Sequence, residues 1–309
     1  QFDQINQISQ KSGIRTISDI WPLYFTDRAH IRSADTLRHR WKALAPHFGP
    51  LPPNAITREH TTAYELHRKN SGRKDWTIWS EIGLVQQILR WAVHQGVIDQ
   101  ASHIERPPAP EPKDLHLTRE QFRTFYAALK DPHQKLFVQL AIATAARKEA
   151  ILQLTWDRVD FERGHIHLRV PGEARRKGRA IVPMTKSLRA ALQDARQWSL
   201  SDHVIEWAGK PVKDVKNGIR RAAIRCDLPW VSAHVLRHTA AVWLVEADVP
   251  MSVVSQYLGH SSISVTEKVY ARFSNDYLQS AADVLDHGLE QAIGSIEPKG
   301  TDKKLKIVK

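Results

Sequence analysis

Hydrophobic residues recur at helical spacing along the first third of the chain. The pattern predicts one helix over residues 34–48 and a longer one over 76–97, where apolar residues return every three or four positions. An apolar-rich start at 17–25 predicts another helix, and Thr57 is the kind of residue that caps a helix N-terminus. The chain therefore begins with a small all-helical domain of about four helices.

A segment rich in proline and charge follows and has no apolar period. Residues 103–117 (HIERPPAPEPKDLHL) read as an extended linker, which divides a helical domain over 1–107 from a second domain over 117–293. Residues 294–309 form a lysine-rich tail that we predict to be disordered.

The second domain mixes helical and alternating patterns. Thr118 opens it with a capping-box pattern, and the nearly continuous apolar run 136–145 predicts a buried helix. Alternation in 165–170 and 180–184 predicts two strands joined by a basic turn. Gly259 is expected to end a later helix as its C-cap. The fold predicted for this domain is mainly α with a small antiparallel sheet.

Composition narrows the function. The net charge of +12 and the pI near 9.8 favour a nucleic acid or another anionic partner. Cys226 is the only cysteine, which rules out an intramolecular disulfide and fits a reducing cytoplasm. Since no run approaches the ~18 apolar residues of a membrane span, a membrane protein is not expected.

Four side chains near the C-terminal end suggest chemistry on a phosphodiester. Tyr270 supplies a nucleophilic oxygen, Arg237 has the planar fork that holds a phosphoryl oxygen, and His234 and His260 can donate hydrogen bonds or move protons. This scheme requires no metal and no cofactor. Simpler alternatives exist for single residues, since His260 follows a glycine as packing histidines do and Tyr270 could belong to a core face with Val265 and Val269.

A zinc site is the alternative for the two histidines four residues apart, His234 and His238. A metalloprotease pair would need glutamate directly after the first histidine, and that position is Val235. We therefore expect no metal and interpret His238 as a structural or supporting residue.

The ordered set of motifs resembles the catalytic domain of the tyrosine recombinase or phage integrase family. HVLRH at 234–238, LGH at 258–260 and Tyr270 follow Arg147, which lies within TAARKEAILQLTWDRVD. The resemblance covers roughly residues 117–286. Taken alone, Arg147 could simply cap helix carbonyls. The family often carries a glutamate three residues after this arginine, where this chain has Ala150.

The resemblance implies a site-specific recombinase or integrase of a phage or mobile element, which cuts DNA through a 3′-phosphotyrosyl intermediate. The implied catalytic residues are Arg147, Lys177, His234, Arg237, His260 and Tyr270. Lys177, in the basic turn, would protonate the leaving oxygen, although Arg176 is the alternative occupant of that place.

The resemblance also assigns the partners. The N-terminal domain would be a SAM-like core-binding domain that contacts DNA through the cations Arg38, Arg40, Lys42, Arg73 and Lys74. The hairpin tip would also contact DNA, through Arg175, Arg176 and Arg179. The alternative interpretation of the cations in the first domain, among them Arg68, is a basic face that is exposed to solvent and binds no DNA. Double-stranded DNA, a tetramer on two DNA sites and accessory DNA-bending or directionality proteins are the implied partners.

Two other functions fit parts of this pattern. A type IB topoisomerase uses similar chemistry to relax supercoils, and a regulatory DNA-binding protein would bind without cutting. A protein that only binds has no need of the full set of Tyr270, both arginines and both histidines. A predicted helix over 275–292 would either pack on its own domain or dock on a neighbouring subunit.

Overall fold

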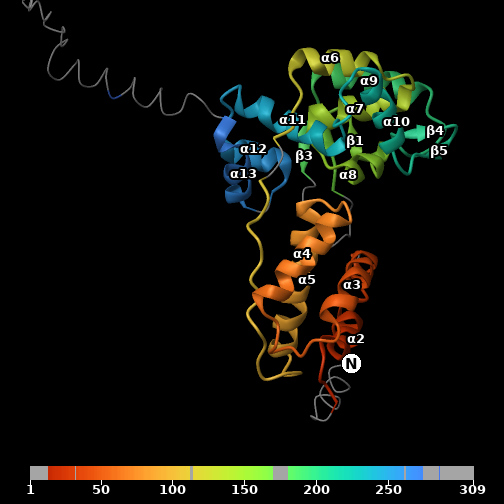
Figure 1. Cartoon of the computed structure of the whole chain (residues 1–309). Coiled ribbons are helices and arrows are strands. Elements are labelled where there is room, and N and C mark those ends of the chain that lie inside the picture. Colours follow the sequence, from red (N-terminus) through yellow and green to blue (C-terminus); the bar gives the residue numbers. More distant parts are fainter. Residues whose placement is uncertain are drawn as a thin grey trace, which may run out of the picture. The chain divides into compact units, whose positions relative to one another are not determined.

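The computed structural model describes residues 13–31, 33–111, 114–169, 180–260 and 262–273, together with residue 285 (Figure 1). The chain divides into two compact units between positions 113 and 114. This division falls inside the segment predicted as a linker. Among the described residues, no helix combines the length and apolar character that crossing a bilayer requires.

The described part of the first unit is a small helical bundle. Its helices are α2 (Ile17–Arg28), α3 (Ala34–Phe48), α4 (Arg58–Asn70) and α5 (Asp75–His94). The long α5 packs against the other three, and α3 also packs against α2. The apolar positions that predicted these helices point inward, since Leu44, Phe48 and Ile82 are fully buried. The four predicted helices are confirmed.

A buried ion pair joins α4 to α5. Arg68 donates from Nε and Nη2 to the two carboxylate oxygens of Glu81, at 2.9 and 2.7 Å, and the Tyr64 hydroxyl donates to Glu81 at 2.8 Å. Glu81 is 4% exposed. The reading of Arg68 as part of a solvated basic face is therefore wrong, because its charge is paired inside the bundle.

Replacing Glu81 with alanine should destabilise the first unit strongly. The change would leave the Arg68 guanidinium and the Tyr64 hydroxyl buried without their acceptor, which typically costs about 3–5 kcal/mol. Denaturant unfolding followed by circular dichroism would measure the loss. Glu65→Ala, which removes a more exposed pair with Lys69, is the control and should cost less than about 1 kcal/mol. Equal losses would show that the buried pair contributes no more than a surface pair.

The second unit is mainly α-helical with two small sheets. Its elements are α6 (Arg119–Ala127), α7 (Pro132–Thr144), α8 (Lys148–Leu152), η1 (Trp156–Arg158), β1 (Val159–Asp160), β2 (His165–His167), β3 (Ile181–Pro183), α9 (Lys186–Gln197), β4 (Glu206–Trp207), β5 (Lys210–Pro211), α10 (Lys216–Arg225), α11 (Ala233–Val245), α12 (Met251–Leu258), α13 (Ile263–Tyr270) and η2 (Ala271–Phe273). The predicted mainly α fold with a small antiparallel sheet is confirmed.

The sheets are antiparallel, in the orders β1-β2-β3 and β4-β5. Ile166 faces Val182 across β2 and β3, and both side chains are buried in the core of this unit. The predicted hairpin thus exists, but its tip at 170–179 lies outside the described residues, together with Arg175, Arg176, Lys177 and Arg179. The predicted helix over 275–292, apart from Leu285, and the tail at 294–309 also lie outside them.

Helix α7 forms the centre of the second unit. Phe137, Val138 and Leu140 are fully buried in it, and α11 packs along it. Thr118 caps α6 as predicted, since its hydroxyl accepts a hydrogen bond from Gln121 N at 3.1 Å. The same core therefore supports α7, which is followed by Arg147, and α11, which carries Arg237.

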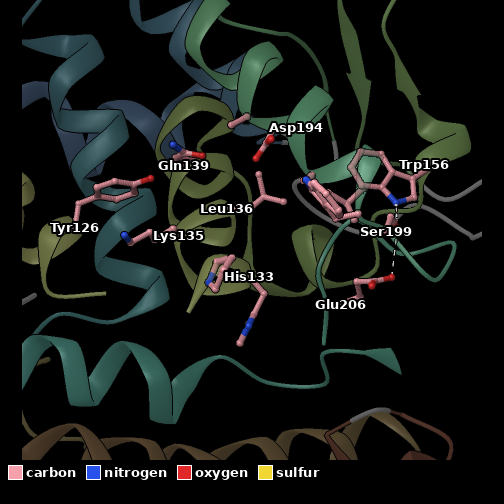
Figure 2. A pocket seen from close by; sticks show the side chains of 14 residues that line it. Tyr126, His133, Lys135, Leu136, Gln139, Trp156, Asp194, Ser199 and Glu206 are labelled. Atoms are coloured by element: carbon pink, nitrogen blue, oxygen red, sulfur yellow. Dashed lines mark hydrogen bonds between the residues drawn. The ribbon is translucent and has the colours of Figure 1, made fainter. Parts of the chain in front are cut away.

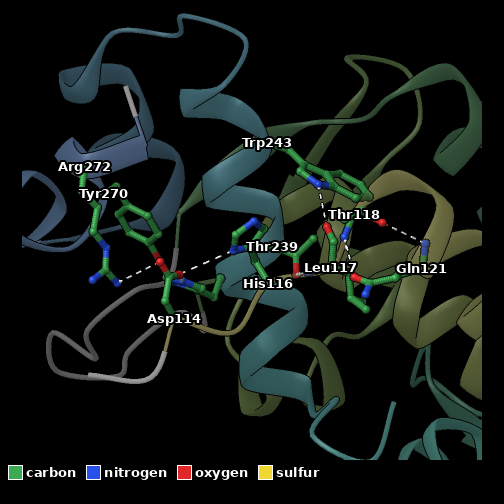
Figure 3. Close-up of polar contacts among 10 residues, drawn as sticks. Asp114, His116, Leu117, Thr118, Gln121, Thr239, Trp243, Tyr270 and Arg272 are labelled. Atoms are coloured by element: carbon green, nitrogen blue, oxygen red, sulfur yellow. Dashed lines mark hydrogen bonds and ion pairs between the residues drawn. The ribbon is translucent and has the colours of Figure 1, made fainter. Parts of the chain in front are cut away.

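The two ends of the predicted linker pack on the units that they adjoin. Ile104 is buried in the first unit, and the Arg106 guanidinium lies 3.4 Å from the centre of the Trp79 ring. In the second unit, Leu117 is buried, accepts from Trp243 Nε1 at 3.0 Å and donates to Thr239 at 2.9 Å (Figure 3). These contacts hold both ends of the segment in place.

Candidate active site

Arg147 directly follows the central helix. Helix α7 ends at Thr144 because Ala145 adopts a left-handed conformation with φ of 48°. Arg147 then precedes α8 and is half-buried, and among the described residues its Nη1 is buried without a hydrogen-bond partner. Burial lowers the pKa of Arg147, and the nearby Tyr270 opposes that shift. Since the described side chains and carbonyls leave this donor unused, capping of helix carbonyls does not account for Arg147.

Arg237 lies on α11 and is buried, with 4% of its surface exposed. Its Nη1 donates to Ala145 O at 2.7 Å, and its Nη2 donates to Leu258 O at 2.9 Å. The guanidinium therefore joins the end of α7 to the end of α12. Burial and the neighbouring Arg147 lower the pKa of Arg237 to about 10, which leaves it charged at neutral pH.

His260 is turned toward Arg237 by a glycine. Gly259 ends α12 in the left-handed conformation with φ of 63°, so the predicted C-cap is confirmed. His260 Nε2 lies 3.1 Å from Arg237 Nη2, and Nδ1 lies 2.8 Å from the buried Thr266 hydroxyl. Because a guanidinium has no acceptor, Nε2 must accept and Nδ1 must carry the proton.

Burial, with the charges of Arg237 and Arg147, lowers the pKa of His260 to about 4, so the ring is neutral at pH 7. In this arrangement His260 orients Arg237. Its expected role as a free donor to the substrate would require this contact to break.

Tyr270 is the last residue of α13 and is 5% exposed. Val265 and Val269 are 48% and 37% exposed, so the three residues do not form one core face. Burial raises the pKa of the Tyr270 hydroxyl, while Arg237 and Arg147 oppose this shift. Both arginines therefore favour the ionised form of this hydroxyl electrostatically.

His238, and not His234, contacts the tyrosine. His238 Nδ1 lies 3.3 Å from the Tyr270 hydroxyl, whereas His234 makes no hydrogen bond within the described residues. His234 lies in the first turn of α11 and is exposed; loss of water around part of its ring and the charges of Arg237 and Arg147 still lower its pKa. His238 was predicted to be a structural or supporting residue, and the HVLRH motif alone does not show which of its two histidines faces the tyrosine.

The site lies away from the hollow drawn in Figure 2. That open pocket of about 490 Å³ is lined by residues of α7 and α9, with Trp156 donating to Ser199 at 2.8 Å in its wall. None of the predicted catalytic residues that the structure describes lines it. Within the described ranges, no group of three or more histidine, cysteine or acidic side chains could hold a metal ion.

Two guanidinium groups, a buried phenol and a histidine at the phenolic oxygen are thus brought together from the residue before α8, from α11 and from the end of α13. This set can bind a phosphate anion and direct an oxygen nucleophile at it. The family model described as "Phage integrase family" matches residues 116–276, more than half of the chain, and includes all of these residues.

This chain belongs to the phage integrase family. It is 26% identical over 250 residues to prophage integrase IntF of Escherichia coli K12, an alignment that covers 74% of this chain and 52% of the relative. The chain therefore spans about half the length of that integrase. It is also 27% identical over 236 residues to tyrosine recombinase XerC of Mycobacterium tuberculosis, covering 69% of this chain and 78% of the relative.

Solved integrase structures share the fold. The Tn1549 transposon integrase in complex with a circular intermediate DNA has a TM-score of 0.75 at 16% identity, covering 88% of this chain and 100% of that one. A lambda integrase tetramer bound to a Holliday junction has a TM-score of 0.67 at 17% identity, covering 87% and 80%. At these identities the likeness establishes the tyrosine recombinase fold.

Proposed function

We propose that this protein is a site-specific DNA recombinase of the integrase type, which cuts and rejoins DNA through a 3′-phosphotyrosyl intermediate at Tyr270. The observation that carries the proposal is the placement of the buried Tyr270 hydroxyl in the field of two arginines, Arg147 and Arg237. Arg147 also has a buried donor, Nη1, to which no described residue offers an acceptor. A protein that only binds DNA gains nothing from burying these charges together, because their desolvation is costly.

In this mechanism the tyrosine oxygen attacks the scissile phosphorus and the 5′ oxygen leaves. Arg147 and Arg237 hold the non-bridging oxygens and stabilise the charge of the transition state. His234, exposed at the first turn of α11, donates to the phosphate, and His260 holds Arg237. Because the phosphotyrosyl bond conserves the energy of the broken bond, a 5′ hydroxyl of a partner duplex reverses the step, and the mechanism calls for neither ATP nor metal.

The test is a nicked suicide duplex that carries the end of the protein's own mobile element. Wild-type protein should form a covalent protein–DNA product on a denaturing gel, and excess EDTA should leave its yield unchanged. Loss of the product in EDTA would contradict the mechanism. Recombinant products distinguish a recombinase from a type IB topoisomerase, which would release relaxed circles.

The partners in this proposal are double-stranded DNA and further copies of the chain in a tetramer on two sites. The lambda integrase tetramer bound to a Holliday junction supports this assembly through the shared fold. Accessory DNA-bending or directionality proteins and a cytoplasmic site of action complete the proposal.

The first unit should contribute contacts to DNA phosphates. Arg73 and Lys74, at the start of α5, are both exposed, as are Arg38 and Lys42 on α3, whereas Arg40 is partly buried. Replacing both Arg73 and Lys74 with alanine should make the negative slope of log K against log salt less steep by about 2, since each phosphate contact releases counterions. A fluorescence anisotropy titration over a salt series would measure the slope.

Arg28→Ala, which removes a cation already paired with Asp27, is the control for this change. The control should alter the slope less than the double variant does. If the Arg73 and Lys74 double variant keeps the wild-type slope, this end of the bundle does not contact DNA.

Lys177 is proposed as the general acid for the leaving 5′ oxygen. Lys177→Ala should slow cleavage of a normal duplex by about 10²-fold or more. On a substrate with sulfur at the 5′ bridging position, Lys177→Ala should cut at nearly the wild-type rate, because a thiolate leaves without a proton. Single-turnover rates on both substrates decide this, and equal slowing would move the role to Arg176.

A further inference from the structure

Asp114 is the first residue of the second unit and lies beside the histidine that contacts the tyrosine. Its Oδ1 lies 3.6 Å from His238 Nε2. Its Oδ2 lies 3.7 Å from Arg272 Nη2, and Figure 3 shows Asp114 and Arg272 side by side. His238 thus has a carboxylate at one ring nitrogen and the Tyr270 hydroxyl at the other. The group bound at one nitrogen of a histidine decides which nitrogen carries the proton.

His238 Nε2 is buried, so a nearby acceptor such as the Asp114 carboxylate affects its protonation. The His238 side chain is 12% exposed, and Nε2 is buried without a hydrogen-bond partner among the described residues. At 3.6 Å the carboxylate is slightly beyond direct hydrogen-bond distance. A buried N–H without an acceptor is costly, and hydrogen bonds of catalytic groups often shorten only when substrate binds. Asp114 is the acceptor that the structure places next to this nitrogen.

We propose that Asp114 is a positioning residue: it accepts the Nε2 proton of His238, so that the unprotonated Nδ1 faces Tyr270 and receives its phenolic proton. This inference rests on the proposed tyrosine-nucleophile function and adds the identity of the base and of the group that orients it. Neither His238 nor Asp114 was among the catalytic residues that the sequence motifs indicated.

The step balances with groups of this chain and the DNA. The phenolic proton of Tyr270 moves to His238 Nδ1 as the phenolic oxygen forms a bond to phosphorus. The bond from phosphorus to the 5′ oxygen breaks, and that oxygen takes a proton from the general acid proposed above, Lys177. His238 becomes an imidazolium, and the Asp114 carboxylate stabilises its charge. When a 5′ hydroxyl attacks the phosphotyrosine, each proton returns along the same route.

Groups on several elements act on His238. Asp114 and His116 lie beside it from the segment before α6, Tyr270 contacts it from α13, and His234 of α11 acts on it through its charge. The Asp114 carboxylate is shared: His116 Nδ1 lies 3.5 Å from Oδ1, and Arg272 of η2 approaches Oδ2. Burial lowers the pKa of His238, Asp114 opposes this shift, and His116 and His234 add to it. Removing the carboxylate should therefore lower the pKa of His238 further. The ring would then remain neutral, and able to accept a proton, to a lower pH.

The test is the pH profile of single-turnover cleavage by full-length Asp114→Asn on the suicide duplex. Cleavage should fall by about tenfold or more at neutral pH, because the base is weaker and its tautomer is no longer fixed. The acid limb of the profile should move to lower pH. Asp114→Glu, which restores the carboxylate, should recover part of the rate. Asp157→Asn removes an exposed carboxylate of the same unit and should behave as wild type.

A second measurement does not depend on cleavage. The ¹⁵N shifts of the His238 ring in the free protein should show the Nε2–H tautomer in wild type and a mixture in Asp114→Asn. A proton on Nδ1 in wild type would overturn the inference even if the covalent adduct forms. The inference would also be overturned if Asp114→Asn cleaved at or above the wild-type rate. A third contradicting result would be slow cleavage by Asp114→Asn with the acid limb of its pH profile at the wild-type position and no recovery of rate in Asp114→Glu.

The two proposals fail in different ways. A wild-type protein that shows the Nε2–H tautomer but forms no adduct with any substrate would refute the proposed function, while the orientation of His238 by Asp114 would stand.

Discussion

Tyr270→Phe should form no covalent adduct with the suicide duplex. The substitution removes only the phenolic oxygen, which is the nucleophile in the proposed mechanism. The ring should stay where it packs against His238 and Phe273. Only the contact of 3.3 Å between the hydroxyl and His238 is lost, so the free energy of unfolding should change by about 1 kcal/mol or less. Affinity for duplex DNA should be unchanged.

Tyr257→Phe is the matched control for this change. Tyr257 lies in the same unit, is partly buried and donates from its hydroxyl to Ala143 O at 2.6 Å. The control should form the adduct as wild type does, and thermal melting would show that both variants are folded. An adduct formed by Tyr270→Phe would exclude this residue as the nucleophile.

Arg237→Lys should slow cleavage by about 10²- to 10³-fold, although it keeps the positive charge. A lysine is a point charge without the planar fork, so it cannot bind the phosphate in two places while holding the carbonyls of Ala145 and Leu258. Loss of one oriented donor in an oxyanion site has an effect of this size. Single-turnover cleavage at saturating protein would measure the rate.

The same variant should also lose stability by about 1–3 kcal/mol, because buried carbonyls lose their donor. Rates should therefore be measured at a temperature where circular dichroism shows the folded state. Arg225→Lys is the control, since Arg225 also donates to a carbonyl, that of Ala128, but lies on α10. A wild-type rate for Arg237→Lys would mean that charge alone suffices and that the fork is not used.

The candidate residues followed from the sequence because motif order carries information that single residues lack. Arg147, His234, Arg237, His260 and Tyr270 were predicted as one set, together with Lys177, which lies outside the described residues. The structure brings Arg147, Arg237, His260 and Tyr270 close together, whereas His234 makes no hydrogen bond within the described residues. Their assignment to individual catalytic steps remains a prediction that the experiments above test.

The sequence by itself determined where most of the described helices lie and, at α6 and α12, the residue at which one end is capped. Helical periodicity and local caps are short-range properties, so Thr118 at the start of α6 and Gly259 at the end of α12 could be predicted from neighbouring residues. The mainly α character of both domains followed from the same signals, and so did the position of Arg147 just after a buried helix.

Only the tertiary structure decided how side chains distant in sequence pair with one another. The pairing of Arg68 with Glu81 depends on the packing of α4 against α5, and the tautomer of His260 depends on Arg237. His234 and His238 lie one turn apart on α11, so local sequence cannot distinguish them, whereas the packing of α13 places Tyr270 beside His238. Asp114 meets that histidine from a point more than a hundred residues earlier. Such contacts depend on how helices pack in three dimensions, and short-range sequence patterns do not predict that packing.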